Sequence, residues 1–225
     1  MPTTNDGVET RRDRQRRQLL DEIETEARRL LEEGGSANVT VRAIARGVGI
    51  GPASLYTYFD SLDDVFTMLL LSSYRRLAAA IATAVAAFVK DPPIDRAAAG
   101  IFAHRRWSLA NRNEFNLIFS DLLPGYAAPT GGPTVAAETE VFQPLVDALG
   151  ELPSTATRHS QQELTALVWT AFHGAVALEV NHHLDWIADP AALHEQAVRN
   201  ALAGVGLPQP SSTIRKRFDR WATKP

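Results

Sequence analysis

Apolar residues recur along this chain at the three- and four-residue spacing of an α-helix, and this periodicity constrains the fold more than any other feature. In the first such segment the apolar positions are Leu19, Leu20, Ile23, Ala27, Leu30 and Leu31. They form one stripe on an otherwise charged helix. No segment shows the apolar–polar alternation of a half-buried strand. The sequence therefore predicts an all-α protein.

Proline and glycine divide the chain into about nine expected helices. Their approximate ranges are 12–33, 40–47, 51–59, 61–89, 94–111, 113–122, 134–149, 157–183 and 190–204. Asp189-Pro190 is a strong start signal, because a carboxylate cap precedes proline at the first helical position. We expect Pro124–Pro133 to be a mobile loop, since glycine and proline dominate it.

The stretch Thr40–Phe59, TVRAIARGVGIGPASLYTYF, predicts two short helices joined by a tight turn with glycine at 47 and 49. Five apolar residues of the first helix and the turn can pack inward, and Leu55 with Phe59 can close the same small core. Small residues at the start of the second helix would let it enter the major groove of DNA, which is about 12 Å wide. Its hydroxyl groups would then face phosphates or base edges.

This stretch resembles the TetR family of transcriptional regulators. The family pattern is a threonine-led helix with an isoleucine-alanine pair, a glycine-valine turn and a leucine-tyrosine-x-[histidine or tyrosine]-phenylalanine run. The chain supplies it as Thr40, Ile44-Ala45, Gly49-Ile50 and Leu55-Tyr56-Thr57-Tyr58-Phe59. The resemblance covers about residues 12–75 by motif and the remainder by architecture.

The resemblance implies an N-terminal three-helix helix-turn-helix DNA-binding domain joined to a C-terminal helical domain for ligand binding and dimerisation. We expect a flexible N-terminal arm at 1–11, the DNA-binding domain at 12–60, the ligand-binding and dimerisation domain at 61–207, and a basic tail at 208–225. The function implied is that of a ligand-responsive repressor. A homodimer would bind a near-palindromic operator in double-stranded DNA and be released by a small-molecule effector.

We predict that DNA contacts come from the basic start of the first helix and from the helix-turn-helix. The residues are Arg12, Arg16, Thr40, Val41, Arg42, Gly51, Pro52, Ala53, Ser54, Tyr56, Thr57 and Tyr58. The whole chain has a net charge of −3, so the positive charge needed for DNA is local. The chain departs from the family at Gly51, where serine is usual, and at Leu62, where lysine is usual, and both changes remove a phosphate contact.

The helix expected at 157–183 is apolar nearly all round and so must be buried on more than one side. Its run Trp169-Thr-Ala-Phe-His173-Gly174 resembles the tryptophan/histidine-glycine signature of one TetR subgroup. The family pairs its last two long helices with those of a second subunit. We therefore predict a homodimer with interface residues Ala171, Gly174, Ala175, Leu178 and His182.

Aromatic side chains, Phe142 among them, are frequent in the C-terminal half and favour an apolar effector pocket with a few polar groups. The candidate ligand-binding residues are Phe102, Trp107, Phe115, Phe119, Trp169, Phe172 and His173. The alternative is that any one of these aromatic residues is simply core. Polar contacts could come from His104, Arg105, Arg106, Asn111 or Asn116. Glu179, His182 and His183 would share a helix face, but they supply too few ligands for a metal site.

Other functional classes find little support in the sequence. The chain has no cysteine, which excludes disulfides and cysteine nucleophiles. It lacks a Gly-x-Ser-x-Gly elbow, a phosphate loop and a His-Glu-x-x-His motif, so we expect no enzyme, cofactor or metal. Gly49-x-Gly51-x-x-Ser54 only faintly resembles a dinucleotide fingerprint, because no strand precedes it. A regulator that binds no ligand remains a third possibility.

No segment of the sequence suggests a membrane or secreted protein. Residues 1–18 lack the apolar stretch of a secretory signal, and the runs Leu77–Val89 and Leu164–Val180 fall short of a membrane span. We expect a cytoplasmic protein that makes no contact with a membrane. In the tail, Ile214, Phe218 and Trp221 predict a short amphipathic helix that packs back on the body, with nucleic-acid or partner contact as the alternative.

Overall fold

The computed structural model describes residues 10–120, 126, 131–152 and 159–224, and within these ranges the chain is helical, with no strand. The N-terminal unit contains α1 (Arg11–Gly34), the 3₁₀ helix η1 (Ser36–Asn38), α2 (Val41–Val48) and α3 (Pro52–Leu55). The C-terminal unit contains α4 (Leu62–Ala87), α5 (Pro93–Ala110), α6 (Arg112–Phe119), α7 (Pro133–Gly150), α8 (Gln161–Val180), α9 (Pro190–Gly204) and α10 (Ile214–Ala222). The all-α prediction is confirmed.

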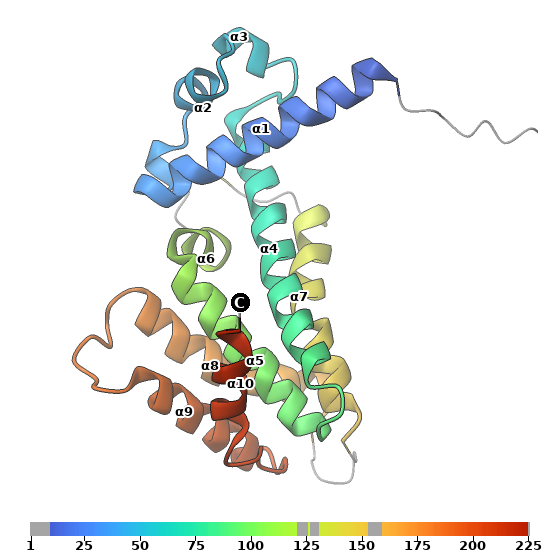
Figure 1. The fold of residues 1–225 in the computed structure, drawn as a ribbon, viewed down its shortest axis with the longest axis vertical. Coiled ribbons are helices and arrows are strands. Elements are labelled where there is room, and N and C mark those ends of the chain that lie inside the picture. Colours follow the sequence, from blue (N-terminus) through green and yellow to red (C-terminus); the bar gives the residue numbers. More distant parts are fainter. Residues whose placement is uncertain (1–9, 121–125, 127–130, 153–158, 225) are drawn as a thin grey trace, which may run out of the picture.

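Helix α4 joins the two units and extends from the helix-turn-helix into the centre of the C-terminal unit (Figure 1). Ser61 caps it, since its hydroxyl accepts from the backbone N–H of Asp64 and the Asp64 carboxylate accepts from the N–H of Ser61. By length and composition α4 could cross a membrane, with a mean hydropathy of 1.3. Half of that apolar window is buried against other helices of the chain, as expected of a core helix.

The N-terminal unit has a small apolar core at the crossing of α1, α2 and α3. Ile23 and Ala27 of α1, Ile44 of α2 and Leu55 of α3 are each at most 1% exposed. This core continues into α4 through Val65 and Leu69, so the two units share one hydrophobic cluster. The helix-turn-helix is therefore held against α4 by packing and not only by the chain connection.

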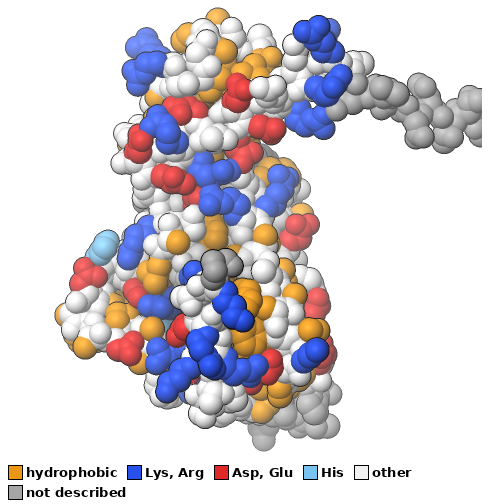
Figure 2. All heavy atoms as spheres, viewed as in Figure 1, with side chains coloured by type: hydrophobic (Ala, Val, Ile, Leu, Met, Phe, Trp, Pro, Cys, Tyr) orange, Lys and Arg blue, Asp and Glu red, His pale blue; other side chains and the backbone are white. Residues whose placement is uncertain are grey.

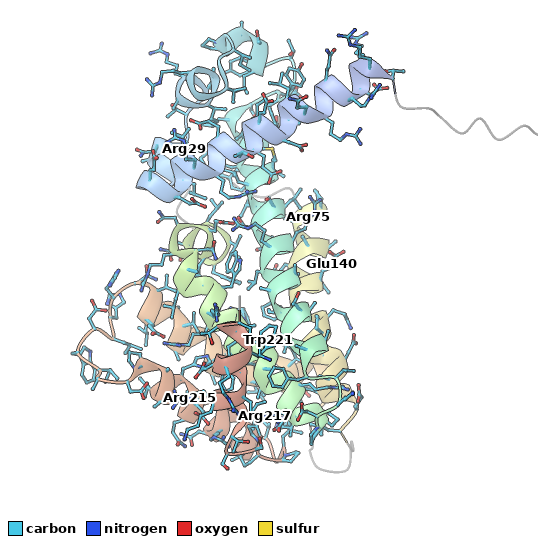
Figure 3. All side chains as sticks on the ribbon, viewed as in Figure 1. Arg29, Arg75, Glu140, Arg215, Arg217 and Trp221 are labelled. Carbon is cyan, nitrogen blue, oxygen red and sulfur yellow. The ribbon has the colours of Figure 1, made fainter. Side chains whose placement is uncertain are left out.

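The tail forms a tenth helix that was not among the nine expected but matches the predicted amphipathic segment. Ile214 and Phe218 of α10 are buried against Phe102 of α5 and Phe88, in what we call the α10 cluster. Arg217 donates a hydrogen bond to Asp91 (2.8 Å) and forms an ion pair with it (2.7 Å), and this interaction lowers the pKa of that carboxyl. Figure 3 shows Arg217 and Trp221 on this helix, in front of α5.

Several helix boundaries differ from the sequence prediction. The third helix ends at Leu55 and continues only as turns, because Tyr58 and Phe59 both donate to the carbonyl of Leu55. Helix α8 begins after the capping residue Ser160 and ends at Val180 rather than near residue 183. Residues 1–9, 121–125, 127–130 and 153–158 lie outside the described residues, and with them most of the predicted arm and of the predicted loop.

Gly100 lies where α5 crosses α4 and α7. A Cβ atom there would lie 2.7 Å from Cδ2 of Leu145, 2.9 Å from Cγ2 of Val85 and 3.3 Å from Cγ2 of Ile81. Since all three contacts are with apolar side chains at this crossing, the position has no room for a larger residue. The close approach of the three helices thus depends on glycine.

We predict that Gly100→Val lowers the free energy of unfolding by about 2–3 kcal/mol, because the added methyl groups overpack the crossing. Urea denaturation followed by circular dichroism measures the change. Gly204→Val is the matched control, since a Cβ atom at Gly204 meets no atom within 4 Å. Equal destabilisation by both substitutions would contradict the packing argument.

Candidate functional site

The tip of the molecule is a helix-turn-helix whose turn is fixed by local hydrogen bonds. The hydroxyl of Thr40 accepts from the backbone N–H of Ala43 (3.1 Å) and so caps α2. Gly49 adopts the left-handed conformation at φ 79°, and Ile50 N–H then donates to the carbonyl of Ala45 (2.9 Å). The chain can therefore reverse sharply and present α3 at the surface.

Helix α3 turns one face inward and leaves the other in solvent. Leu55 is 1% exposed and anchors the helix, whereas Tyr56 is 54% exposed. The remaining exposed residues are Gly51, Pro52, Ala53, Ser54 and Thr57. Gly51 is the N-cap, and a Cβ atom there would meet only Ser54 Oγ, at 3.8 Å. Apart from Tyr56 the exposed residues are small, so the start of the helix can approach another macromolecule closely.

Basic side chains flank this face. The Arg16 guanidinium lies 5.0 Å from the centre of the Tyr58 ring, a cation–π contact that joins α1 to the segment after α3. Arg12 on α1 and Arg42 and Arg46 on α2 are exposed. Figure 2 shows Lys and Arg side chains gathered on both sides of this end of the molecule. A protruding helix between two basic flanks has the form and charge needed to dock in a DNA groove.

A second candidate site is a group of aromatic rings between α5, α6 and α8, with one ring from α7, which we call the aromatic cluster. Its members are His104, Phe115, Phe119, Phe142, Trp169, Phe172 and His173. The ring centres of His104 and Phe172 are 5.1 Å apart, those of Phe119 and His173 4.6 Å, and those of Trp169 and His173 5.0 Å. Phe142 joins through Trp169 at 5.3 Å.

Burial keeps the histidines of this cluster neutral at physiological pH. His104 has no exposed surface, and burial holds the pKa of its imidazole well below the usual value. Burial also lowers the pKa of His173. Neither ring nitrogen of His104 has a hydrogen-bond partner within the described residues, and the same holds for Nδ1 of His173 and Nε1 of Trp169.

Helix α6 connects this cluster with the N-terminal unit. Phe115 and Phe119 belong to the cluster, while Asn113 donates to the backbone carbonyls of Leu31 (2.9 Å) and Glu32 (3.0 Å) in the last turn of α1. Glu114 of α6 is 1% exposed. It accepts a hydrogen bond from Ser73 (2.9 Å) and forms an ion pair with Arg76, both on α4. One short helix is thus bonded to both units.

Comparison with known families decides the class of protein. Residues 23–68 match the family described as bacterial regulatory proteins, tetR family, and residues 97–201 match the tetracyclin repressor-like C-terminal domain. Together the two matches span more than half of the chain, in the order and at the positions of the two units.

The chain belongs to the TetR family of transcriptional regulators.

Relatives support this assignment along most of the chain. The HTH-type transcriptional regulator Rv1816 of Mycobacterium tuberculosis is 26% identical over 221 residues, which cover 84% of this chain and 94% of that protein. The regulator Mb1846 of Mycobacterium bovis matches to the same extent. A TetR-family regulator binds DNA and is not an enzyme, as the sequence predicted.

Solved structures show the same fold. A crystal structure of a regulatory protein designated SCO4313 has a TM-score of 0.70 and 27% identity, and covers 86% of this chain and 100% of that one. The structure of RolR in complex with resorcinol has a TM-score of 0.60 at 19% identity, and covers 92% of this chain and 96% of that one.

The predicted ligand-binding residues of this TetR-family chain divide between two places. Five lie together in the aromatic cluster: Phe115, Phe119, Trp169, Phe172 and His173. Phe102 instead packs in the α10 cluster, and Trp107 lines a cavity of about 680 Å³ between α4, α5 and α10. Helical spacing could not separate them, because α5 is buried around most of its circumference.

The predicted dimerisation residues lie on α8, with one exception. Leu178 is 47% exposed, Ala171, Gly174 and Ala175 are partly exposed, and a Cβ atom at Gly174 would meet nothing within 4 Å. His182 lies beyond the helix, in a left-handed conformation at φ 64°, and bonds to Asp185 (3.1 Å). The expected shared face of Glu179, His182 and His183 therefore does not form, since the helix has ended.

Two functional candidates escaped the sequence analysis. Asn113 gave no signal, because a lone asparagine near a helix start is typical of capping its own helix, whereas here it caps α1. The Arg16–Tyr58 contact joins residues that were predicted separately, and only the packing of α1 beside the helix-turn-helix brings them together. His104 was named as one of several polar candidates, but nothing in the sequence singled it out.

We predict that Tyr58→Ala weakens binding to all DNA sequences about equally, because Arg16 loses the ring that positions it for the phosphate backbone. For Arg16→Ala, the slope of log affinity against log salt concentration should fall by about one, because one phosphate contact is lost. Fluorescence anisotropy with specific and scrambled duplexes at several salt concentrations measures both effects. Ser54→Ala is the contrast, expected to alter sequence preference, and a change of preference alone for Tyr58→Ala would refute the assignment.

Proposed function

We propose that this TetR-family regulator is a ligand-responsive repressor that binds a near-palindromic operator as a homodimer and is released by a small-molecule effector. The observation that carries the proposal is the double attachment of α6, which lines the aromatic cluster and caps the last turn of α1. A molecule that displaces Phe115 or Phe119 would move α6. The position of α1, and with it the helix-turn-helix, would then change.

The proposed division of labour follows the two units. Residues 12–60 would bind DNA through Arg12, Arg16 and Arg42 on the flanks and the α3 face in the groove. Residues 61–207 would hold the effector and the dimer contact, and 208–225 the tail that closes the α10 cluster. The C-terminal unit would be of the tryptophan/histidine-glycine type, which the contact of Trp169 with His173 supports.

The release mechanism is a shift between two dimer states with different spacing of the two α3 helices. Only the state that places them about 34–36 Å apart fits successive major grooves. An effector that binds the other state 100-fold more tightly weakens operator binding by about 2.7 kcal/mol. The fold neighbour RolR was solved with resorcinol, which supports a small-molecule ligand in this fold.

A dimer is supported by apolar surface on the last two long helices. Leu167 and Leu178 of α8 and Leu193 of α9 are 42%, 47% and 40% exposed, and Trp186 between the helices is 79% exposed. Exposed apolar side chains of this size are typical of an interaction surface. A second copy of α8 and α9 would cover them in a four-helix arrangement.

We predict that selection of bound duplexes from a random library recovers a near-palindrome with half-sites about one helical turn apart. Leu178→Glu should halve the mass in light scattering and lower affinity for the full site by about 100-fold or more, because a charge enters the interface. Val89→Glu is the matched control, since Val89 is 63% exposed and lies in the connection between α4 and α5. A dimer that survives Leu178→Glu would remove this interface.

We predict that Asn113→Ala uncouples the two units. All four tryptophans lie in the C-terminal unit, so fluorescence follows that unit and far-UV circular dichroism follows the whole chain. In the wild type, the urea transitions measured by fluorescence and by circular dichroism should coincide. In the variant the circular dichroism transition should begin at a lower urea concentration, because α1 has lost its cap.

Asn116→Ala is the matched control for this experiment. Asn116 also lies on α6, but its amide bonds to Asn181 (3.1 Å) within the C-terminal unit. Its loss should shift both transitions together. Coincident transitions in Asn113→Ala would show that the α6 attachment carries no coupling.

A further inference from the structure

His104 is the most unusual side chain in the molecule. It has no exposed surface, and neither Nδ1 nor Nε2 has a partner among the residues that the structure describes. Buried polar groups are nearly always hydrogen-bonded, since an unpaired one loses its hydration without compensation. The nitrogens of His104 are therefore available to a group from outside the described residues, such as a bound molecule.

Two neighbours have the same property. Nδ1 of His173 and Nε1 of Trp169 are buried and unpaired, and the ring centres connect in series, His104 to His173 at 5.9 Å and His173 to Trp169 at 5.0 Å. The unpaired atoms come from α5 and α8 and lie in one cluster.

The polar groups of the cluster are neutral, which limits the charge of that molecule. Arg105, next to His104 in sequence, donates a hydrogen bond to Glu179 on α8 (2.7 Å). Glu114 on α6 accepts a hydrogen bond from Ser73. A bound anion or cation would therefore lack a free counter-charge from these groups, and an unpaired charge is costly to bury. An uncharged molecule fits the cluster best.

The donors and acceptors specify the polar group of the molecule. A neutral imidazole offers one N–H donor and one acceptor nitrogen, and the indole N–H only donates. A hydroxyl group can donate to an imidazole nitrogen and accept from the indole N–H at the same time. A bare carbonyl accepts only, and would leave the acceptor nitrogens unpaired.

The walls specify the rest of the molecule. His104, Phe115 and Phe172 are sealed, whereas Phe119, Phe142, Trp169 and His173 keep part of their ring surface accessible although they pack in the cluster. Aromatic faces and edges of this kind favour a planar ring in stacked or edge-on contact. The accessible rings come from α6, α7 and α8, and two of them, Trp169 and His173, carry unpaired nitrogens.

We infer that the effector is a small, uncharged, hydroxylated aromatic molecule whose hydroxyl group pairs with His104, His173 and Trp169 in the aromatic cluster. This inference rests on the proposed function and adds the chemical class of the ligand. It also assigns the effector to the aromatic cluster and not to the cavity at α10.

Calorimetric titration of the full-length protein with phenol, and with toluene as the analogue without a hydroxyl group, tests the inference. The wild type should bind phenol at least about 10-fold more tightly than toluene, because toluene leaves the buried nitrogens unpaired. In His104→Phe this preference should fall below about 3-fold, since the imidazole nitrogens that pair with the hydroxyl group are lost. Trp169→Phe, which removes only the indole N–H, should lower phenol affinity and spare toluene.

His194→Phe is the matched control. His194 is 1% exposed and also has an unpaired nitrogen, but it packs on Phe102 beside the α10 cluster. It should leave the preference for phenol unchanged. Thermal melting checks the fold, because His104→Phe removes unpaired buried nitrogens and should melt at or above the wild-type temperature.

Three results would overturn the inference: no saturable phenol binding by the wild type within the solubility of phenol, an equal preference in wild type and His104→Phe, or loss of the preference in His194→Phe. Operator binding is measured separately by gel shift with the selected duplex. Release of the operator by a charged or non-aromatic molecule, with no preference for phenol, would refute the ligand class and leave the repressor intact. Failure to recover any operator would refute the proposed function without bearing on phenol binding.

Discussion

The burial of α4 along most of its length is the constraint on which the rest of the structure depends. Val65, Leu77, Ile81 and Ala84 have no exposed surface, and they lie at successive levels from the helix-turn-helix to the far end of the C-terminal unit. Burial of each of the three larger side chains contributes about 1.5–3 kcal/mol, and burial of Ala84 contributes less. Because one continuous helix carries all of these contacts, packing along α4 fixes the relative orientation of the two units.

Much of the fold could be predicted from local sequence, because its signals are local. Thr40 and the Ser61/Asp64 pair mark helix starts by capping, and Gly49 marks a left-handed turn. Helix α9 has the predicted bounds, since Asp189-Pro190 fixes its start. The predicted end of α8 was wrong by three residues, because the sequence has no glycine or proline directly after Val180 to mark where the helix stops. The amphipathic helix of the tail was predicted from its own spacing, whereas its contacts with Phe88 and Asp91, which are distant in sequence, required the tertiary structure.

The candidate sites could be predicted only in part. The exposed face of α3 follows from its motif, as every residue between Gly51 and Thr57 except Leu55 faces solvent. The aromatic cluster needed tertiary information, since aromatic residues on α5 point to two different places: His104 toward α8 and Phe102 toward α10. No periodicity distinguishes a core ring from a ring that lines a ligand site, because both must be apolar and buried.

The unpaired nitrogens of His104 have a consequence for the lifetime of the protein in the cell. A buried group without a partner lowers the stability of the empty fold, and a ligand that supplies the partner binds the folded chain alone. Binding therefore reduces the unfolded fraction by mass action. Since proteases and quality-control factors act on that fraction, a molecule that occupies the cluster would slow turnover and raise the amount of the protein.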